Sequence, residues 1–137
     1  FGIIKSFPDI DFCLTQSRSV RALLDLDAMR DICEDLAHLR VGYWHDAALT
    51  TRRQQVLGEA PVEWLEAFGN RCRGVTVGDA SPDGLYLPPG AGGVDLGLVA
   101  SYAPTTGTPL RIVLELDPAV AASELPGVRS CLDKFGL

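Results

Sequence analysis

Residues 41–46 read Val41-Gly42-Tyr43-Trp44-His45-Asp46, a short apolar run that ends in an acid. Three other segments repeat this design and end in a polar residue at Thr15, Asp79 and Glu115. Each run is followed by a helical pattern or by a glycine-rich loop. Near-continuous apolar strands are typical of strands buried on both faces, so the repetition predicts a parallel sheet covered by helices.

The expected strands cover residues 10–14, 41–46, 72–77 and 110–116, and they follow one another across the sheet in chain order. This is an α/β fold of the (β/α) TIM-barrel type, with about four βα units in one domain over residues 1–137. A complete barrel needs about 250 residues, so the pattern corresponds to half a barrel. Half a barrel exposes two strand edges, and we expect the isolated chain not to be a stable monomer.

Helices, loops and a turn are expected between the strands. The expected helices run from Asp25 or Asp27 to about Leu39, from Pro61 to Phe68, over 94–102, and from Pro118 to about Phe135 with an interruption at Pro126-Gly127. The expected irregular segments are a charged loop over 47–60, a loop over 78–93 and a turn region over 104–109.

Composition excludes several classes of protein. The chain has 12 basic and 18 acidic residues, and its net charge of −6 argues against a nucleic-acid or anionic-membrane partner. No apolar run approaches the ~20 residues that span a bilayer. Charged residues interrupt the start of the chain, which argues against a signal peptide. The four widely spaced cysteines are expected to be reduced and partly buried, and we expect a cytoplasmic protein.

Alternate strand residues share a face, so one register predicts which side chains line an interior pocket. Asp46 and Trp44 then face the pocket together, as do Glu115 and Arg111, with Asp79 at the rim. The two strand-end acids could bind a divalent cation or share general acid and base work. Alternatively, they cap the following helices or pair with arginines.

Other polar residues near the strands are interpreted more simply. His45 points away from the pocket, toward the helices, where a hydrogen-bonded structural histidine is expected. The run Pro88-Pro89-Gly90-Ala91-Gly92-Gly93 lacks the Lys and Ser/Thr of a phosphate-binding P-loop, which favours a structural or lid loop. Arg52 and Arg53 either meet an anionic substrate above the pocket or lie on a solvated loop.

Several motifs together resemble a known family. They are Gly42-Tyr43-Trp44-His45-Asp46, residues 63–71 (Glu-Trp-Leu-Glu-Ala-Phe-Gly-Asn-Arg), residues 74–80 (Gly-Val-Thr-Val-Gly-Asp-Ala), residues 89–95 (Pro-Gly-Ala-Gly-Gly-Val-Asp) and Ile112-Val113-Leu114-Glu115-Leu116. In this order they are similar to the C-terminal half of xylose isomerase-like TIM barrels, the sugar-phosphate isomerase/epimerase and endonuclease-IV-like proteins. The resemblance runs through almost the whole chain.

The resemblance implies a divalent metal held by Glu, Asp, His and Glu from successive late strands, with the two Glu acting as bases. In this chain the first Glu falls on Thr15, the Asp on Asp46, the His on Gly78 and the last Glu on Glu115. Thr is a weak neutral ligand and Gly offers none, so the implied site is degenerate. At most a weakly held Mg²⁺ or Mn²⁺ is expected, and no other cofactor.

The leading hypothesis is therefore a degenerate sugar-phosphate isomerase/epimerase-like protein without metal-dependent isomerase activity. It retains binding of a small sugar-like or phosphorylated ligand, through Trp44, Asp79 and Arg111, or serves as a scaffold. One alternative is an active isomerase, epimerase or lyase that uses Asp46, Asp79 and Glu115, with Glu115 as the catalytic residue. Another is an interaction module that completes a barrel with another chain, as a homo-oligomer or with a missing N-terminal half.

Overall fold

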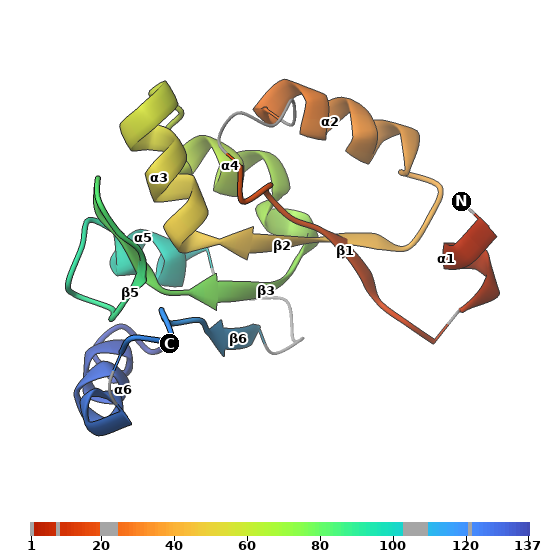
Figure 1. The fold of residues 1–137 in the computed structure, drawn as a ribbon. Coiled ribbons are helices and arrows are strands. Elements are labelled where there is room, and N and C mark those ends of the chain that lie inside the picture. Colours follow the sequence, from red (N-terminus) through yellow and green to blue (C-terminus); the bar gives the residue numbers. More distant parts are fainter. Residues whose placement is uncertain (1, 8, 20–24, 103–109, 121) are drawn as a thin grey trace.

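Four parallel strands form the centre of the molecule (Figure 1). The computed structural model describes residues 2–7, 9–19, 25–102, 110–120 and 122–137, so the turn region expected over 104–109 lies outside the described residues. The strands are β1 (Phe12–Leu14), β2 (Val41–Asp46), β3 (Cys72–Val77) and β6 (Arg111–Leu114), in the spatial order β1-β2-β3-β6. All three neighbouring pairs are parallel, which confirms the predicted order and direction of the strands. The two outer strands are shorter than the predicted 10–14 and 110–116. The chain is thus a mixed α/β protein with a four-stranded parallel sheet.

Helices fill the connections, and α2, α3 and α4 lie on one side of the sheet (Figure 1). The helical elements are α1 (Gly2–Ser6), α2 (Leu26–Asp35), α3 (Ala47–Leu57), α4 (Pro61–Phe68), α5 (Leu96–Ser101) and α6 (Leu125–Asp133), with short 3₁₀ turns η1 (Gly69–Arg71) and η2 (Ala122–Glu124).

The predicted start of α2 is confirmed, whereas its predicted end is too late. Asp25 is the N-cap, and its side-chain oxygen accepts a hydrogen bond of 2.8 Å from the backbone N–H of Ala28. The helix ends at Asp35, and the residues up to Leu39 form turns. The helix α4 has its predicted bounds, with Pro61 in its first turn, where a missing N–H costs no helical hydrogen bond.

The prediction of a loop over residues 47–60 is wrong, because most of this segment is the helix α3. Asp46 caps its first turn, and Gly58 ends it with a left-handed φ of 77°. Apart from Leu49, the buried residues of α3 are small or polar, and they include Thr50, Thr51 and Arg53. Such residues leave no apolar stripe in the sequence, so the helical period is hidden.

The expected absence of regular structure over residues 78–93 is also wrong. The strands β4 (Asp79–Ala80) and β5 (Leu85–Leu87) pair antiparallel within this segment. The last helix differs too, since α6 begins at Leu125 and runs through Pro126-Gly127 without interruption. Pro126 lies in the first turn of α6, where proline is tolerated.

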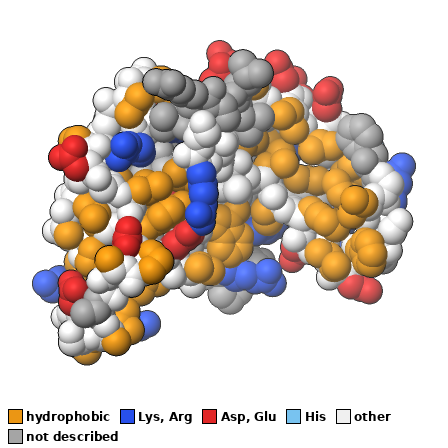
Figure 2. Space-filling view, viewed as in Figure 1, with side chains coloured by type: hydrophobic (Ala, Val, Ile, Leu, Met, Phe, Trp, Pro, Cys, Tyr) orange, Lys and Arg blue, Asp and Glu red, His pale blue; other side chains and the backbone are white. Residues whose placement is uncertain are grey.

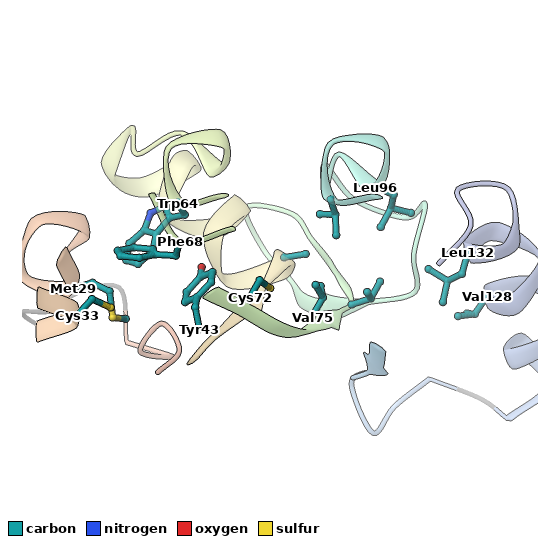
Figure 3. Packing of buried hydrophobic residues seen from close by; sticks show 13 residues of the cluster. Met29, Cys33, Tyr43, Trp64, Phe68, Cys72, Val75, Leu96, Val128 and Leu132 are labelled. Atoms are coloured by element: carbon teal, nitrogen blue, oxygen red, sulfur yellow. The ribbon is translucent and has the colours of Figure 1, made fainter. Parts of the chain in front are cut away.

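The core lies between the sheet and the helices (Figure 3). Tyr43 of β2 projects toward Met29 of α2 and toward Trp64 and Phe68 of α4, and Val75 of β3 belongs to the same cluster. These five side chains are at most 2% exposed. The alternation that places Tyr43 and Val75 in the core turns their strand neighbours to the other face of the sheet.

Two further expectations from composition concern the state of the cysteines and membrane-spanning segments. Cys13, Cys33, Cys72 and Cys131 are all free thiols. Burial raises the pKa of the Cys13, Cys33 and Cys72 thiols, so they favour the protonated form. Within the described ranges, no helix has both the length and the apolar character needed to cross a membrane.

Candidate functional site

A pocket opens at the carboxyl ends of the four parallel strands, on the face of the sheet opposite the core. Its volume is about 400 Å³. The residues that line it come from β1, β2 and β3 and from the segments that follow the four strands: Cys13, Thr15, Gln16, Arg18, Trp44, Asp46, Leu49, Thr76, Tyr86 and Glu115.

Three of the predicted site residues meet in this pocket and two do not. Trp44, Asp46 and Glu115 line it together, whereas Asp79 and Arg111 are not among its lining residues. The register explains the grouping, because Asp46 aligns with Thr76 on the neighbouring strand and both side chains face the pocket. Arg18 and Tyr86 also line the pocket, and the sequence patterns did not indicate them.

Asp46 is the most constrained acid of the pocket. One carboxylate oxygen accepts a 2.9 Å hydrogen bond from the N–H of Leu49, as the cap of α3. The other accepts a 3.0 Å hydrogen bond from the hydroxyl of Tyr86. Burial raises the pKa of Asp46; the two hydrogen bonds oppose this shift, and the charge of Glu115 adds to it. Asp46 therefore takes the capping role that the sequence left open, and both of its oxygens are engaged.

Glu115 contacts Arg18, which lies in the segment that follows β1. The Arg18 guanidinium forms an ion pair with the Glu115 carboxylate and lies 5.3 Å above the centre of the Tyr86 ring. Arg18 and Glu115 are 97 positions apart in the chain, so only the closure of the fold brings them together. Burial, followed by the negative charge of Asp46, raises the pKa of Tyr86, which keeps its hydroxyl a hydrogen-bond donor.

Trp44 forms an aromatic wall of the pocket. Its indole N–H donates a 2.9 Å hydrogen bond to the hydroxyl of Thr76. The ring lies against Gly74 so closely that a Cβ atom on this glycine would overlap it. Glycine at position 74 is thus required for this orientation of the ring. The indole and the hydroxyl groups of Thr15 and Thr76 give the pocket a mixed aromatic and polar lining.

Asp79 and Arg111 take part in other contacts. The Asp79 carboxylate is 1% exposed and accepts hydrogen bonds from the N–H groups of Ala80, Gly90 and Val94, each 2.8 or 2.9 Å long. Asp79 thereby holds the glycine-rich loop against β4. The donating backbone N–H groups are occupied by this carboxylate. Arg111 lies 3.9 Å from the carboxylate of Asp11, and both side chains are exposed.

His45 points away from the pocket, as expected from the strand alternation. It is fully buried, and its Nδ1 lies 2.9 Å from the hydroxyl of Tyr43. Burial lowers the pKa of His45 to about 3, so the imidazole is neutral. Gln16 connects this pair to the pocket, since its amide group hydrogen-bonds both the Tyr43 hydroxyl and the backbone N–H of Asp46.

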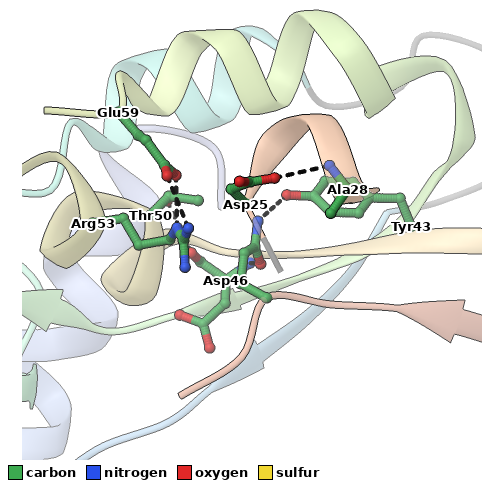
Figure 4. A network of polar contacts seen from close by, with 8 residues as sticks. Asp25, Ala28, Tyr43, Asp46, Thr50, Arg53 and Glu59 are labelled. Carbon is green, nitrogen blue, oxygen red and sulfur yellow. Dashed lines mark hydrogen bonds and ion pairs between the residues drawn. The ribbon is translucent and has the colours of Figure 1, made fainter. Parts of the chain in front are cut away.

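Arg52 and Arg53 lie on the helix α3, neither on a solvated loop nor in the pocket lining. Arg53 is buried in the helix layer, where its guanidinium forms two hydrogen bonds of 2.7 and 2.8 Å with Glu59 (Figure 4). It also lies 5.5 Å from the centre of the Trp64 ring. Arg52 donates a 3.0 Å hydrogen bond to the backbone oxygen of Ser81. Both arginines thus have partners outside the pocket.

The ligand set implied by the family resemblance does not fit this site. Gly78 stands where the implied imidazole belongs, and a Cβ atom there would crowd the backbone oxygen of Glu115 and the Tyr86 side chain. Thr15 supplies only a neutral hydroxyl, and both oxygens of Asp46 are engaged. In the part of the chain that the structure describes, no three His, Cys, Asp or Glu residues are grouped to hold a metal ion.

In comparisons with known proteins, no protein-family model matches the chain, and no curated protein matches it.

Proposed function

We propose that this protein is a half-barrel of the xylose isomerase-like type whose pocket binds a small, uncharged sugar-like ligand without metal-dependent isomerisation. The observation that carries the proposal is the packing around Gly78. Tyr86 and the backbone of Glu115 fill the space that an imidazole at this position would need. The pocket thus keeps its place at the strand ends, while its interior is packed in a way that disfavours the implied metal site.

The lining of the pocket supports a sugar as the ligand. An aromatic wall suits the apolar face of a sugar ring, and hydroxyl groups on neighbouring strands can exchange hydrogen bonds with sugar hydroxyls. Trp44 supplies the wall, and Thr15, Thr76 and Glu115 supply polar groups around it. Binding in such a pocket needs no proton transfer by the protein.

The charges in the pocket favour an uncharged ligand over a phosphorylated one. The carboxyl groups of Asp46 and Glu115 lie in the lining, and Arg18 is the basic residue among the lining residues. Arg18 already pairs with Glu115, so its charge is largely offset. A phosphate group would therefore meet net negative charge and would leave its solvation shell without a free cation to replace it.

Fluorescence titration with ribose and with ribose 5-phosphate tests this proposal. The chain has two tryptophans: Trp44 lines the pocket, and Trp64 is fully buried in the core and gives a constant background. We expect saturable changes in the millimolar range with ribose, and weaker binding of the phosphate. Glu115→Gln should weaken ribose binding several-fold, whereas Glu66→Gln, an exposed change on α4, should leave it unchanged.

Two results would overturn the proposal. One is the absence of saturable binding for both sugars. The other is stoichiometric, sub-micromolar binding of Mn²⁺ or Zn²⁺ in calorimetry that disappears in Asp46→Ala or Glu115→Ala. Metal-dependent conversion of an aldose to a ketose would support the alternative of an active isomerase.

A further inference from the structure

The sheet has two open edges. β1 pairs only with β2, and β6 pairs only with β3, so no strand within the described ranges lies on their outer sides. Every residue of β6 is exposed, and the three apolar ones, Ile112, Val113 and Leu114, are 37–46% exposed. Hydrophobic side chains also reach the surface around α1 and α6 (Figure 2). An exposed apolar strand at a sheet edge favours pairing with a further strand.

An apolar groove of about 720 Å³ lies between β6 and α6. Ile112 and Leu114 align with Val75 and Val77 of β3, so they project to the helix side of the sheet and form one wall of the groove. Leu125 and Leu132 of α6 are among the residues of the other wall. In right-handed βαβ units, the helix that follows a strand also covers the next parallel strand. The groove is therefore the place for helix-side residues of such a strand.

The chain itself contains a segment with the required pattern. Ile10, Phe12 and Leu14 alternate along the β1 segment, and pairing with β2 turns Phe12 and Leu14 to the helix side. Ile10 is 53% exposed, and the outer edge of β1 is unpaired. Asp11 lies between the apolar residues and projects to the opposite face, the face on which Arg111 projects from β6. The alternation of apolar residues along the β1 edge thus matches the apolar edge and groove at β6.

The sheet is also curved in the sense that closure requires. Asp11 approaches Arg111 to 3.9 Å, and Arg18 pairs with Glu115, so side chains from the first and last strands meet across the pocket face. Four is half the number of strands in an eight-stranded barrel, whose interior is filled by side chains. Two copies related by a two-fold axis that coincides with the barrel axis would have all eight strands parallel.

We propose that a second copy of this chain covers the groove, with β1 of each copy pairing beside β6 of the other to close an eight-stranded barrel. The open sides of the two pockets then face each other across the barrel axis, so each site is completed by the partner copy. This inference rests on the proposed barrel fold but not on the proposed ligand. Sugar binding and subunit mass are measured separately, so failure of one proposal is distinguishable from failure of the other.

Light scattering coupled to gel filtration measures the assembly, and paired variants test which edges meet. The wild-type chain should have twice its 14.7 kDa mass at micromolar concentration. Ile112→Lys and Ile10→Asp each place a charge in the apolar contact and should raise the dimer dissociation constant on the order of 100-fold or more. Val56→Asp is the matched control, because Val56 is 53% exposed on α3, away from both edges.

Mixing the two variants gives the decisive result. The mixed dimer keeps one native pair of edges, and its other pair brings Lys at position 112 against Asp at position 10. We therefore expect an equimolar mixture to regain the dimer that neither variant forms alone. Ile10→Asp dimerising like wild type would show a symmetric β6 contact and overturn the proposal. A wild-type monomer, or a mass that keeps growing with concentration, would overturn it as well. Circular dichroism of each variant verifies that the exposed substitutions leave the fold intact.

Discussion

Replacement of Glu59 by alanine should strongly destabilise this protein, because it leaves a buried cation without its counter-ion. The Arg53 side chain is only 1% exposed. Its Nε and Nη2 atoms both donate to the Glu59 carboxylate, at 2.7 and 2.8 Å, while Nη1 has no hydrogen-bond partner in the described structure. Glu59 is therefore the group that offsets the desolvation of this guanidinium.

The magnitude follows from the burial of the pair. Removal of one partner from a buried ion pair costs about 3–5 kcal/mol. The Glu59 side chain is 20% exposed, so water can partly replace it, and we expect the lower end, about 3 kcal/mol. An unfolding entropy of about 2 cal/mol/K per residue over the 137 residues converts this loss into a fall of about 10 °C in Tm. A loss of about 3 kcal/mol is a large part of the free energy of unfolding of a typical domain, which is roughly 5–15 kcal/mol.

Urea unfolding followed by far-ultraviolet circular dichroism measures this change. Wild type and variants are compared at one protein concentration, because association shifts apparent stability. Asp27→Ala is the control: Asp27 pairs with Arg30 at 2.9 Å, but its side chain is 86% exposed, and its loss should cost below about 1 kcal/mol. A loss of less than about 1 kcal/mol for Glu59→Ala would refute the reasoning, since it would mean that Arg53 is solvated.

Three further predictions concern buried polar groups and tight packing. The pKa of His45 is about 3 in the folded protein against 6.5 ordinarily, so unfolding takes up a proton between these values. Stability from the neutral imidazole is thus complete above pH 6.5 and falls by up to about 1.4 kcal/mol per pH unit below it; an imidazolium signal from His45 in NMR spectra at pH 5 would contradict this. Asp46→Ala should cost about 1–3 kcal/mol more than Asp46→Asn in urea unfolding, because the Asn carboxamide keeps an oxygen that accepts from the Leu49 N–H and an NH2 group that can donate to the Tyr86 hydroxyl oxygen, whereas alanine offers neither. Gly92→Ala should cost about 1–3 kcal/mol, because its Cβ would overlap the Asp79 carboxylate; unchanged amide exchange in residues 88–94 would argue against this packing.

Local patterns in the sequence were sufficient for the four strands and for several helix boundaries. Apolar residues predominate in the strand segments, and that pattern is visible without knowledge of what surrounds them. Asp25 and Pro61 mark helix starts through interactions within one turn, so neighbouring residues alone reveal them. The face on which Trp44, Asp46 and Glu115 meet followed from strand alternation, which is equally local.

Contacts between residues distant in the sequence determined the helix α3 and the hydrogen-bond partners in and around the pocket. The helix α3 buries Thr50 and Arg53, whose burial depends on partners from other turns and on Trp64, so no apolar period marks it. The lone pairs of Asp46 are taken up by Tyr86, 40 positions away, and those of Asp79 by a loop up to 15 positions away. Arg18 enters the pocket by pairing with Glu115. A sequence pattern records which residues tend to be buried and how they repeat, whereas only the closed fold decides which donor meets which acceptor. That choice separates a strand-end carboxylate available to a ligand from one already hydrogen-bonded within the protein.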